Sequence, residues 1–263
     1  MLTGTVKRAY ERHKKPVCLG RFGKNYLADD GECLWAEVFE NNPKISREIY
    51  PGCVWVPEIK GNRPYIDYIQ TQAQNKVVYK DIYRPTPGEI FFTDEEKAKY
   101  DYSDFIYIEP NVKYFQGQPT FGGNKDWGFE RWQEVVKRLP YEFIQGKGRK
   151  LDGVTQVDTE RFRDACALLS RARLFLGPDG GLHHAAAALG LPAVVVWGGL
   201  VGPEVLGYDF HTNLRGKGVR SCGSHKPCEH CREAMSKVTV DMVIDAVHKE
   251  MNADIWLEAE GRS

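Results

Sequence analysis

The sequence predicts an α/β fold made of two Rossmann-like, doubly wound halves, with the N-terminal half reduced in size. From Phe105 onward, β-prone runs alternate with segments whose apolar residues recur at helical spacing, whereas the pattern before Asp104 is shorter and irregular. Repeated strand–helix units build a parallel sheet whose ligands bind at the carboxyl ends of the strands. We therefore expect a reduced domain over residues 1–100, an α/β domain over 101–238, and a terminal helix over 239–263 that packs back toward the N-terminal domain.

The first half offers a few separate elements. Thr5 to His13 is predicted to form a short basic helix, and Pro16 to Leu19 a short strand. Leu34 to Phe39 has a helical pattern, which the segment NNPK at 41–44 ends. Cys53 to Val56 is predicted to be another strand.

In the second half, strands are predicted from runs of apolar, β-prone residues. FIYIEP (Phe105 to Pro110) and AVVVW (Ala193 to Trp197) are typical of strands buried on both faces. Shorter strands are expected at Phe143–Gln145 and Leu174–Leu176.

The helices between these strands are predicted from apolar residues at helical spacing. Asp158 or Thr159 is placed to cap the second of them, and an Ala-rich helix is expected over His183–Leu189. The apolar positions are Phe129, Trp132, Val135, Val136 and Leu139 for the first helix, Phe162, Ala165, Cys166 and Leu169 for the second, and Val240, Val243, Ile244, Val247 and Met251 for the terminal helix.

Composition excludes some classes of function. Lys+Arg and Asp+Glu are equal at 36 each among the 263 residues, which argues against a protein that mainly coats nucleic acid. The basic N-terminal segment lacks the apolar core of a signal peptide, and the longest apolar stretch, Ala185 to Leu200, is broken by Gly190 and Pro192. Seven unevenly spaced cysteines fit a reducing compartment. We expect a cytoplasmic protein without a transmembrane segment.

The most informative stretch runs from Phe175 to Gly199, where a strand leads through Asp179-Gly180-Gly181 directly into a helix. A helix N-terminus offers free backbone N–H groups and partial positive charge, and glycines allow a phosphate to approach closely. His184, in the first turn, could add a donor to a diphosphate, and Asp179 could orient the loop or bind a sugar hydroxyl. Spacing alone also fits an ordinary strand–helix turn with a capping Asp and incidental histidines.

This stretch resembles family 9 of the glycosyltransferases, the heptosyltransferase-like enzymes of the GT-B fold. Their motif reads Asp-Ser/Thr-Gly-x-x-His-x-Ala-Ala-Ala, followed by Pro and a strand that ends in Gly. Gly180 replaces the usual Ser/Thr, which removes one hydroxyl, and His183 replaces an apolar residue, so that we expect it to pack. The positions that match are Asp179, Gly181, His184, Ala186 to Ala188, Pro192 and Gly198.

Two further segments add to the resemblance. The family's Lys-x-Trp segment matches Lys125 and Trp127, which implies that Lys125 neutralises donor phosphate and that Trp127 supports the loop. Gln145-Gly146 lies where such enzymes hold the nucleobase. Near the end, the family's Cys-rich patch matches Cys222, Cys228 and Cys231.

The Cys-rich patch allows two interpretations. A zinc site would need a fourth ligand, which His225 or His230 could supply. The long gap between Cys222 and Cys228 favours free or packed thiols instead. We therefore predict no metal and no cofactor.

The acceptor side matches the family least. Family members begin with a strand and a Gly-Asp turn whose Asp is the usual candidate base, and this sequence opens at Met1-Leu2-Thr3-Gly4, after the expected place of that turn. A base is still needed to take the proton of the acceptor hydroxyl. Asp29 and Asp30, in a Gly-flanked loop, are the base candidates, although a solvated turn in DDG explains each of them better.

The resemblance implies an enzyme that moves a sugar from a nucleotide-diphosphate sugar to an acceptor hydroxyl, with inversion and without a metal. The acceptor would be a glycan or a lipid-linked saccharide. One alternative is a catalytically impaired protein that only binds a nucleotide sugar. Another is a glycosyltransferase acting on a modified DNA base, which the basic residues Lys7, Arg8, Arg12, Lys14 and Lys15 would favour. A dinucleotide oxidoreductase is disfavoured because no G-x-G-x-x-G follows the first strand.

Overall fold

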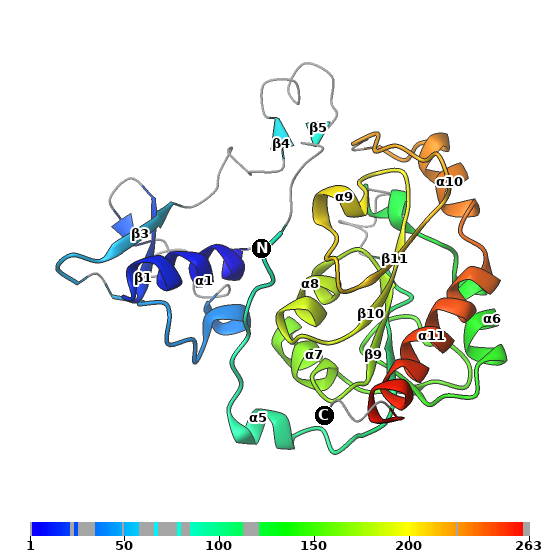
Figure 1. The fold of residues 1–263 in the computed structure, drawn as a ribbon, viewed down its shortest axis with the longest axis horizontal. Helices are drawn as coiled ribbons and strands as arrows, with labels where there is room; N and C mark the ends of the chain where they lie inside the picture. The colour runs from blue at the N-terminus through cyan, green and yellow to red at the C-terminus, as the bar shows by residue number, and fades with distance from the viewer. Residues whose placement is uncertain are drawn as a thin grey trace.

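The structure, a computed structural model, describes residues 2–21, 24–25, 35–48, 50–57, 66–67, 78–79, 85–112, 121–224 and 226–259. Figure 1 shows two unequal parts, a small N-terminal lobe and a larger C-terminal domain. In the described part of the chain, no helix is long and apolar enough to span a bilayer.

A six-stranded sheet forms the centre of the C-terminal domain. Its strands follow the order β11-β10-β9-β6-β7-β8, and every neighbouring pair is parallel. The chain first builds outward from β6 to β8, then returns to the other side of β6 and builds outward again to β11. The strands are β6 (Ile106–Ile108), β7 (Phe143–Gln145), β8 (Thr155–Gln156), β9 (Leu174–Pro178), β10 (Ala193–Trp197) and β11 (Thr212–Arg215).

Helices cover both faces of this sheet, as a parallel sheet requires. On β10, Val194 and Val196 pack with α6 (Phe129–Arg138) and α11 (Val240–Ala259), whereas the alternate residues pack with α7 (Phe162–Leu169) and α8 (Gly181–Ala188). Side chains alternate between the two faces of a strand, so both sets must be apolar. This explains the uninterrupted run AVVVW, and the predicted doubly wound sheet is confirmed.

The N-terminal lobe is small and built on a three-stranded sheet. β1 (Val17–Arg21) pairs in parallel with β3 (Val54–Pro57) and antiparallel with β2 (Lys24–Asn25). α1 (Leu2–His13) and the π-helix η1 (Trp35–Phe39) accompany it, and a separate pair, β4 (Ile66–Asp67) and β5 (Val78–Tyr79), is antiparallel. Its core consists of Val6, Val17, Phe39 and Ile45.

The two parts meet at the N-terminus of α7. The backbone N–H of Arg163 donates to Glu37 of η1 at 2.7 Å. Its guanidinium, buried with 1% of the side chain exposed, pairs with Glu96 of α5 (Asp94–Ala98) at 2.5 Å and donates to the carbonyl of Phe91. Arg163 thus connects the start of α7 to η1 of the lobe and to the segment that contains Phe91 and Glu96.

One sequence prediction differs from the structure. The N-cap of α7 is Arg161, and neither Asp158 nor Thr159 caps the helix. The carboxylate of Asp164 accepts the Arg161 N–H, while the Thr159 hydroxyl accepts the N–H of Lys147 instead. The main contacts of α11 are with α6, β9, β10 and β11, because its apolar face covers the even-numbered side chains of the central strands. The packing of the terminal helix back toward the N-terminal domain stays a prediction.

Several elements of the C-terminal domain lie in segments whose patterns are too short or too polar to predict. β8 has two residues, both exposed, and β11 alternates polar and apolar residues only partly. The remaining ones are α9 (Pro203–Leu206), α10 (Glu229–Ser236) and the 3-10 helix η2 (Phe121–Lys125).

Candidate functional site

The topology places the switch point of the sheet, where an open parallel sheet forms its ligand crevice, between β6 and β9. These two strands are neighbours in the sheet, and the chain leaves them in opposite directions, which makes this the topological switch point. In open parallel sheets, ligands bind outside the carboxyl ends of the strands at such a point. The segment after β9 is the Asp179-Gly180-Gly181 loop that the sequence singles out.

The two glycines of this loop serve different purposes. A Cβ at Gly180 would meet no atom within 4 Å, so the backbone here is open to a ligand. A Cβ at Gly181 would lie 3.1 Å from the ring of Phe162, so this glycine lets α8 approach α7 closely. Because α8 begins at Gly181, its free N–H groups face the same open space. Free N–H groups at a helix N-terminus are a geometry that can bind anions.

Lys125 and Asp179, 54 positions apart in the sequence, form an ion pair at this loop. The Lys125 ammonium contacts the Asp179 carboxylate, and it lies 3.5 Å from the Asp179 carbonyl oxygen. The Asp179 side chain is only 4% exposed and that of Lys125 is 17% exposed. The carboxylate therefore holds the one cation that the sequence predicts for donor phosphate beside the helix N-terminus.

His184 lies one turn into α8 and contacts a residue that sequence reasoning missed. Its Nδ1 lies 2.9 Å from the hydroxyl of Tyr208, which is itself buried. Desolvation lowers the pKa of His184 to about 3, so the imidazole is neutral at neutral pH. A neutral ring that accepts the Tyr208 hydroxyl at Nδ1 carries its proton on Nε2 and can donate one hydrogen bond from there.

The expectation that His183 packs agrees with its surroundings. It is fully buried, and its ring stacks edge-on or tilted against Trp197, Tyr208 and His211 at centroid distances of 5.3–5.4 Å. Neither ring nitrogen has a hydrogen-bond partner among the residues the structure describes. Burial lowers its pKa well below the ordinary value. His183 thus supports the helix that carries His184.

The other side of the crevice is formed by the segments after β6 and β7. Glu109 directly follows β6, and its carboxylate accepts the N–H of Asn111 at 2.8 Å. Sequence reasoning missed Glu109, although an acid directly after the strand run FIYI was the available signal. Gln145, predicted to lie near the nucleobase, is buried and uses its amide to hold the loop at Leu151 and Arg149.

Trp127 is part of the core behind this crevice. Its indole N–H donates to the carbonyl of Val238 at 2.8 Å, and its ring lies edge-on to Trp132 at 4.5 Å. It therefore fixes the start of α6 against the turn before α11. The base candidates Asp29 and Asp30 lie outside the described residues.

The Cys-rich patch forms a compact cluster. The ligand atoms of Cys222, Cys228, His230 and Cys231 all lie within 4.8 Å of one another, although Cys222 precedes the others by a long gap. Cys222 is held by a 2.7 Å hydrogen bond from its N–H to the carbonyl of Gly199, just after β10. A hydrogen bond from the Cys231 thiol lowers the pKa of Cys222 to about 5. Of the two fourth ligands proposed from sequence, His230 joins the cluster, and His225 lies outside the described residues.

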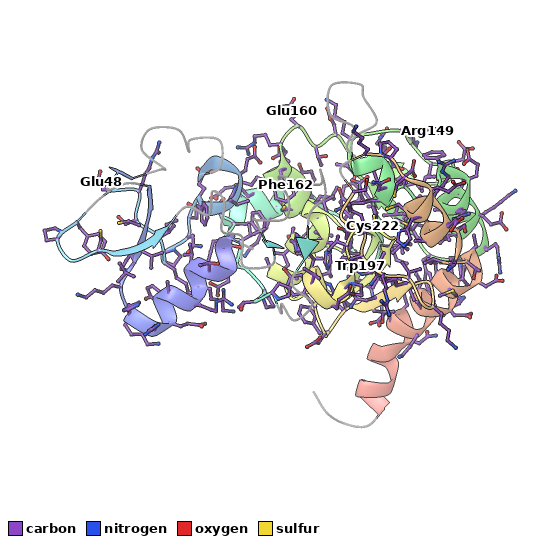
Figure 2. All side chains as sticks on the ribbon, turned by 90° about the horizontal axis from the view of Figure 1, so that it is seen from above. Glu48, Arg149, Glu160, Phe162, Trp197 and Cys222 are labelled. Atoms are coloured by element: carbon purple, nitrogen blue, oxygen red, sulfur yellow. The ribbon has the colours of Figure 1, made fainter. Side chains whose placement is uncertain are left out.

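Figure 2 shows Cys222 near Trp197, the last residue of β10, within the C-terminal domain and well apart from Glu48 of the N-terminal lobe. The cluster therefore lies at the carboxyl end of β10, the strand next to the one that delivers Asp179.

Residues 159–239 match the model of glycosyltransferase family 9 (heptosyltransferase). This segment is therefore similar to the family 9 glycosyltransferases. The resemblance indicated by the sequence motifs is confirmed for it. The matched segment contains Asp179, Gly180, Gly181, His184 and the three cysteines of the cluster, whereas Lys125 comes from the preceding part of the chain.

Solved structures support the fold. The iron-containing dodecameric glycosyltransferase TibC of enterotoxigenic E. coli has a TM-score of 0.60 at 15% identity, with 96% of this chain and 73% of that chain covered. TibC in complex with ADP-D-β-D-heptose has a TM-score of 0.58 at 14% identity, with the same coverage. With the six-stranded parallel sheet, this confirms the predicted GT-B fold class.

A third structure gives the chain's length in relation to its relatives. Heptosyltransferase II of E. coli has a TM-score of 0.47 at 16% identity, with 64% of this chain covered. The chain spans 54% of the length of that protein. No curated protein matches the sequence.

Proposed function

We propose that this chain binds a nucleotide-diphosphate sugar at the Asp179–Gly181 loop and transfers the sugar to an acceptor hydroxyl. The observation that carries the proposal is the ion pair of Lys125 with Asp179 beside the N-terminus of α8, in an open loop at the switch point of a parallel sheet. The family 9 match of this segment supports the same chemistry.

The residues of this loop would stabilise the leaving group of the transfer. The acceptor oxygen attacks the anomeric carbon, the bond from that carbon to the diphosphate oxygen breaks, and the acceptor proton passes to a base. The departing diphosphate gains negative charge, which Lys125, the α8 N–H groups and the His184 Nε2–H stabilise in place. Inversion at the anomeric carbon, and transfer without a catalytic metal, rest on the family resemblance.

In the free protein Lys125 is neutralised by Asp179, and this shapes the expected response to a ligand. A diphosphate placed at the loop competes with Asp179 for the ammonium, while the carboxylate remains close by. Asp179 thus orients Lys125 and limits how tightly the product diphosphate is held. Asp29 and Asp30 stay the proposed bases on the acceptor side. A protein that binds the nucleotide sugar without transferring it is the alternative.

We also propose that Cys222, Cys228, Cys231 and His230 hold one metal ion. Three thiols and an imidazole within 4.8 Å match the donor set of four-coordinate sites for zinc or iron, and TibC, of similar fold, is iron-containing. Bound there, the ion would cross-link the loop after β11 to α10. Metal analysis of the purified protein should find one ion per chain, lost in Cys228→Ser.

The proposed donor site is tested by calorimetric titration with UDP, ADP, GDP and CDP, followed by variants measured with the nucleotide that binds. Lys125→Met should weaken the nucleoside diphosphate about 10- to 100-fold, since a hydrogen bond to a charged group contributes about 1.5–3 kcal/mol. The parent nucleoside, which lacks phosphate, should bind both proteins equally. His184→Ala should weaken the diphosphate in the same way without unfolding the protein.

The matched control is Lys137→Met, which removes an exposed lysine from α6. Its affinity for the diphosphate should equal that of the wild type. Unchanged affinity in Lys125→Met, or equal losses in both lysine variants, would remove the loop from the proposed site. Diphosphate binding without sugar transfer to any acceptor would favour the non-catalytic alternative.

A further inference from the structure

Asn124 lies between the cysteine cluster and the proposed donor site. Its side chain, 3% exposed, makes three hydrogen bonds. The amide nitrogen donates to the carbonyls of Ser224 at 3.1 Å and Lys226 at 2.8 Å, and the amide oxygen accepts the N–H of Cys228 at 3.0 Å. All the groups that Asn124 recognises therefore belong to the loop between two metal-ligand positions, Cys222 and Cys228.

The backbone of Asn124 makes a separate contact, with the end of β10. A Cβ at Gly198, just after β10, would lie 3.1 Å from the Asn124 carbonyl oxygen, so that η2 packs directly on the end of this strand. α10, which carries Cys231, is also in contact with η2. The next residue along η2 is Lys125, whose ammonium reaches Asp179. One short helix thus joins the cysteine loop to the cation of the donor site.

We propose that Asn124 is a positioning residue that couples the Cys222/Cys228/His230/Cys231 cluster to Lys125, so that metal binding and nucleoside diphosphate binding strengthen each other. An ion that fixes the cysteines also fixes Ser224, Lys226 and Cys228, the partners of Asn124. Without the ion, these partners lose their cross-link, and the position of Lys125 becomes less defined. This inference rests on the proposed donor site and on the proposed metal site.

Linkage makes the coupling measurable from either ligand, because the factor by which one changes the other's affinity is reciprocal. The wild-type protein, freed of metal with a chelator, is titrated with Co²⁺ with and without saturating ADP. Thiolate–cobalt absorption reports the ligand set independently of any activity. ADP is then titrated calorimetrically into the cobalt-loaded and metal-free protein. Each ligand should bind at least fivefold more tightly when the other is present, within the 5- to 150-fold range usual for coupled sites.

In Asn124→Ala, ADP should change the Co²⁺ affinity by less than twofold, and Co²⁺ should change the ADP affinity by less than twofold. The cobalt absorption should keep its shape, since all four ligands remain. The matched control is Gln133→Ala, which removes an amide that makes a similar pair of hydrogen bonds to the backbone of Asp152, away from both sites. This control should keep the full coupling.

The wild-type measurement decides the inference even where Asn124→Ala does not fold. Equal ADP affinity in the two metal states would overturn the coupling and leave the donor site standing. Full coupling in a folded Asn124→Ala protein would remove Asn124 from it. If neither ADP nor UDP, GDP or CDP bound in any metal state, both the donor site and the coupling would be refuted.

Discussion

Replacing Glu96 by Gln should destabilise the protein more than replacing its partner Arg163 by Met. The guanidinium of Arg163 is almost fully buried, with 1% of its side chain exposed, whereas 24% of the Glu96 side chain is exposed. Breaking a buried ion pair from one side costs about 3–5 kcal/mol, because the other charge stays desolvated. Glu96→Gln leaves that buried cation with a single acceptor oxygen from residue 96 where it now has two, while Phe91 still accepts one N–H and the more exposed Glu40 carboxylate lies 3.8 Å away. We expect a loss of about 3 kcal/mol.

Arg163→Met should cost only about 1–2 kcal/mol, because the remaining carboxylate can be hydrated and still accepts the N–H of Thr93. The substitution also removes Arg163 Nη1, which has no partner in the described part of the chain. Urea unfolding followed by tryptophan fluorescence gives both free energies. A larger loss in Arg163→Met than in Glu96→Gln would refute this reasoning.

The pH dependence of the free energy of unfolding provides a second test of the ion pair between Arg163 and Glu96. The hydrogen bond from Arg163 holds the pKa of Glu96 below its ordinary value. A carboxyl whose pKa is lower in the folded state stabilises the protein above its unfolded pKa, and this contribution disappears as the pH falls through the folded value. The difference between wild type and Arg163→Met should therefore shrink below about pH 4.5.

Two further predictions concern α8 and its surroundings. Burial lowers the pKa of His211 to about 4 and that of His184 to about 3, and it lowers the pKa of His183 as well. The unfolded chain therefore binds more protons than the folded one below about pH 6.5. The free energy of unfolding should be largest above that pH and fall toward pH 4. A urea midpoint that stays constant from pH 7.5 to 5 would contradict this prediction. Gly180→Ser should be tolerated, because a Cβ there meets no atom within 4 Å, and its hydroxyl should tighten nucleoside diphosphate binding severalfold by calorimetry. Weaker binding would mean that the diphosphate lies closer to the backbone than we propose.

Local pattern was sufficient to predict the elements that build the donor side. Ala193 to Trp197 was predicted as a buried strand, and the helix after Asp179 was placed within two residues of its true start at Gly181. Both depend on interactions between residues close in sequence, namely β-branched side chains in one case and alanines following glycines in the other. The cap of α7 was wrong because several polar residues near its start compete for free N–H groups, and tertiary contacts engage Thr159 elsewhere.

What the sequence alone determined is the kind of fold, the strand–loop–helix segment at Asp179, and the residue types that can hold a diphosphate. The tertiary structure decided which distant residues meet. It paired Lys125 with Asp179, set Tyr208 against His184, and closed the gap between Cys222 and Cys228 through the hydrogen bonds of Asn124. These contacts depend on the order of the strands in the sheet, because that order sets which loops share its carboxyl edge. No local pattern encodes it, since it follows from the packing of both faces at once.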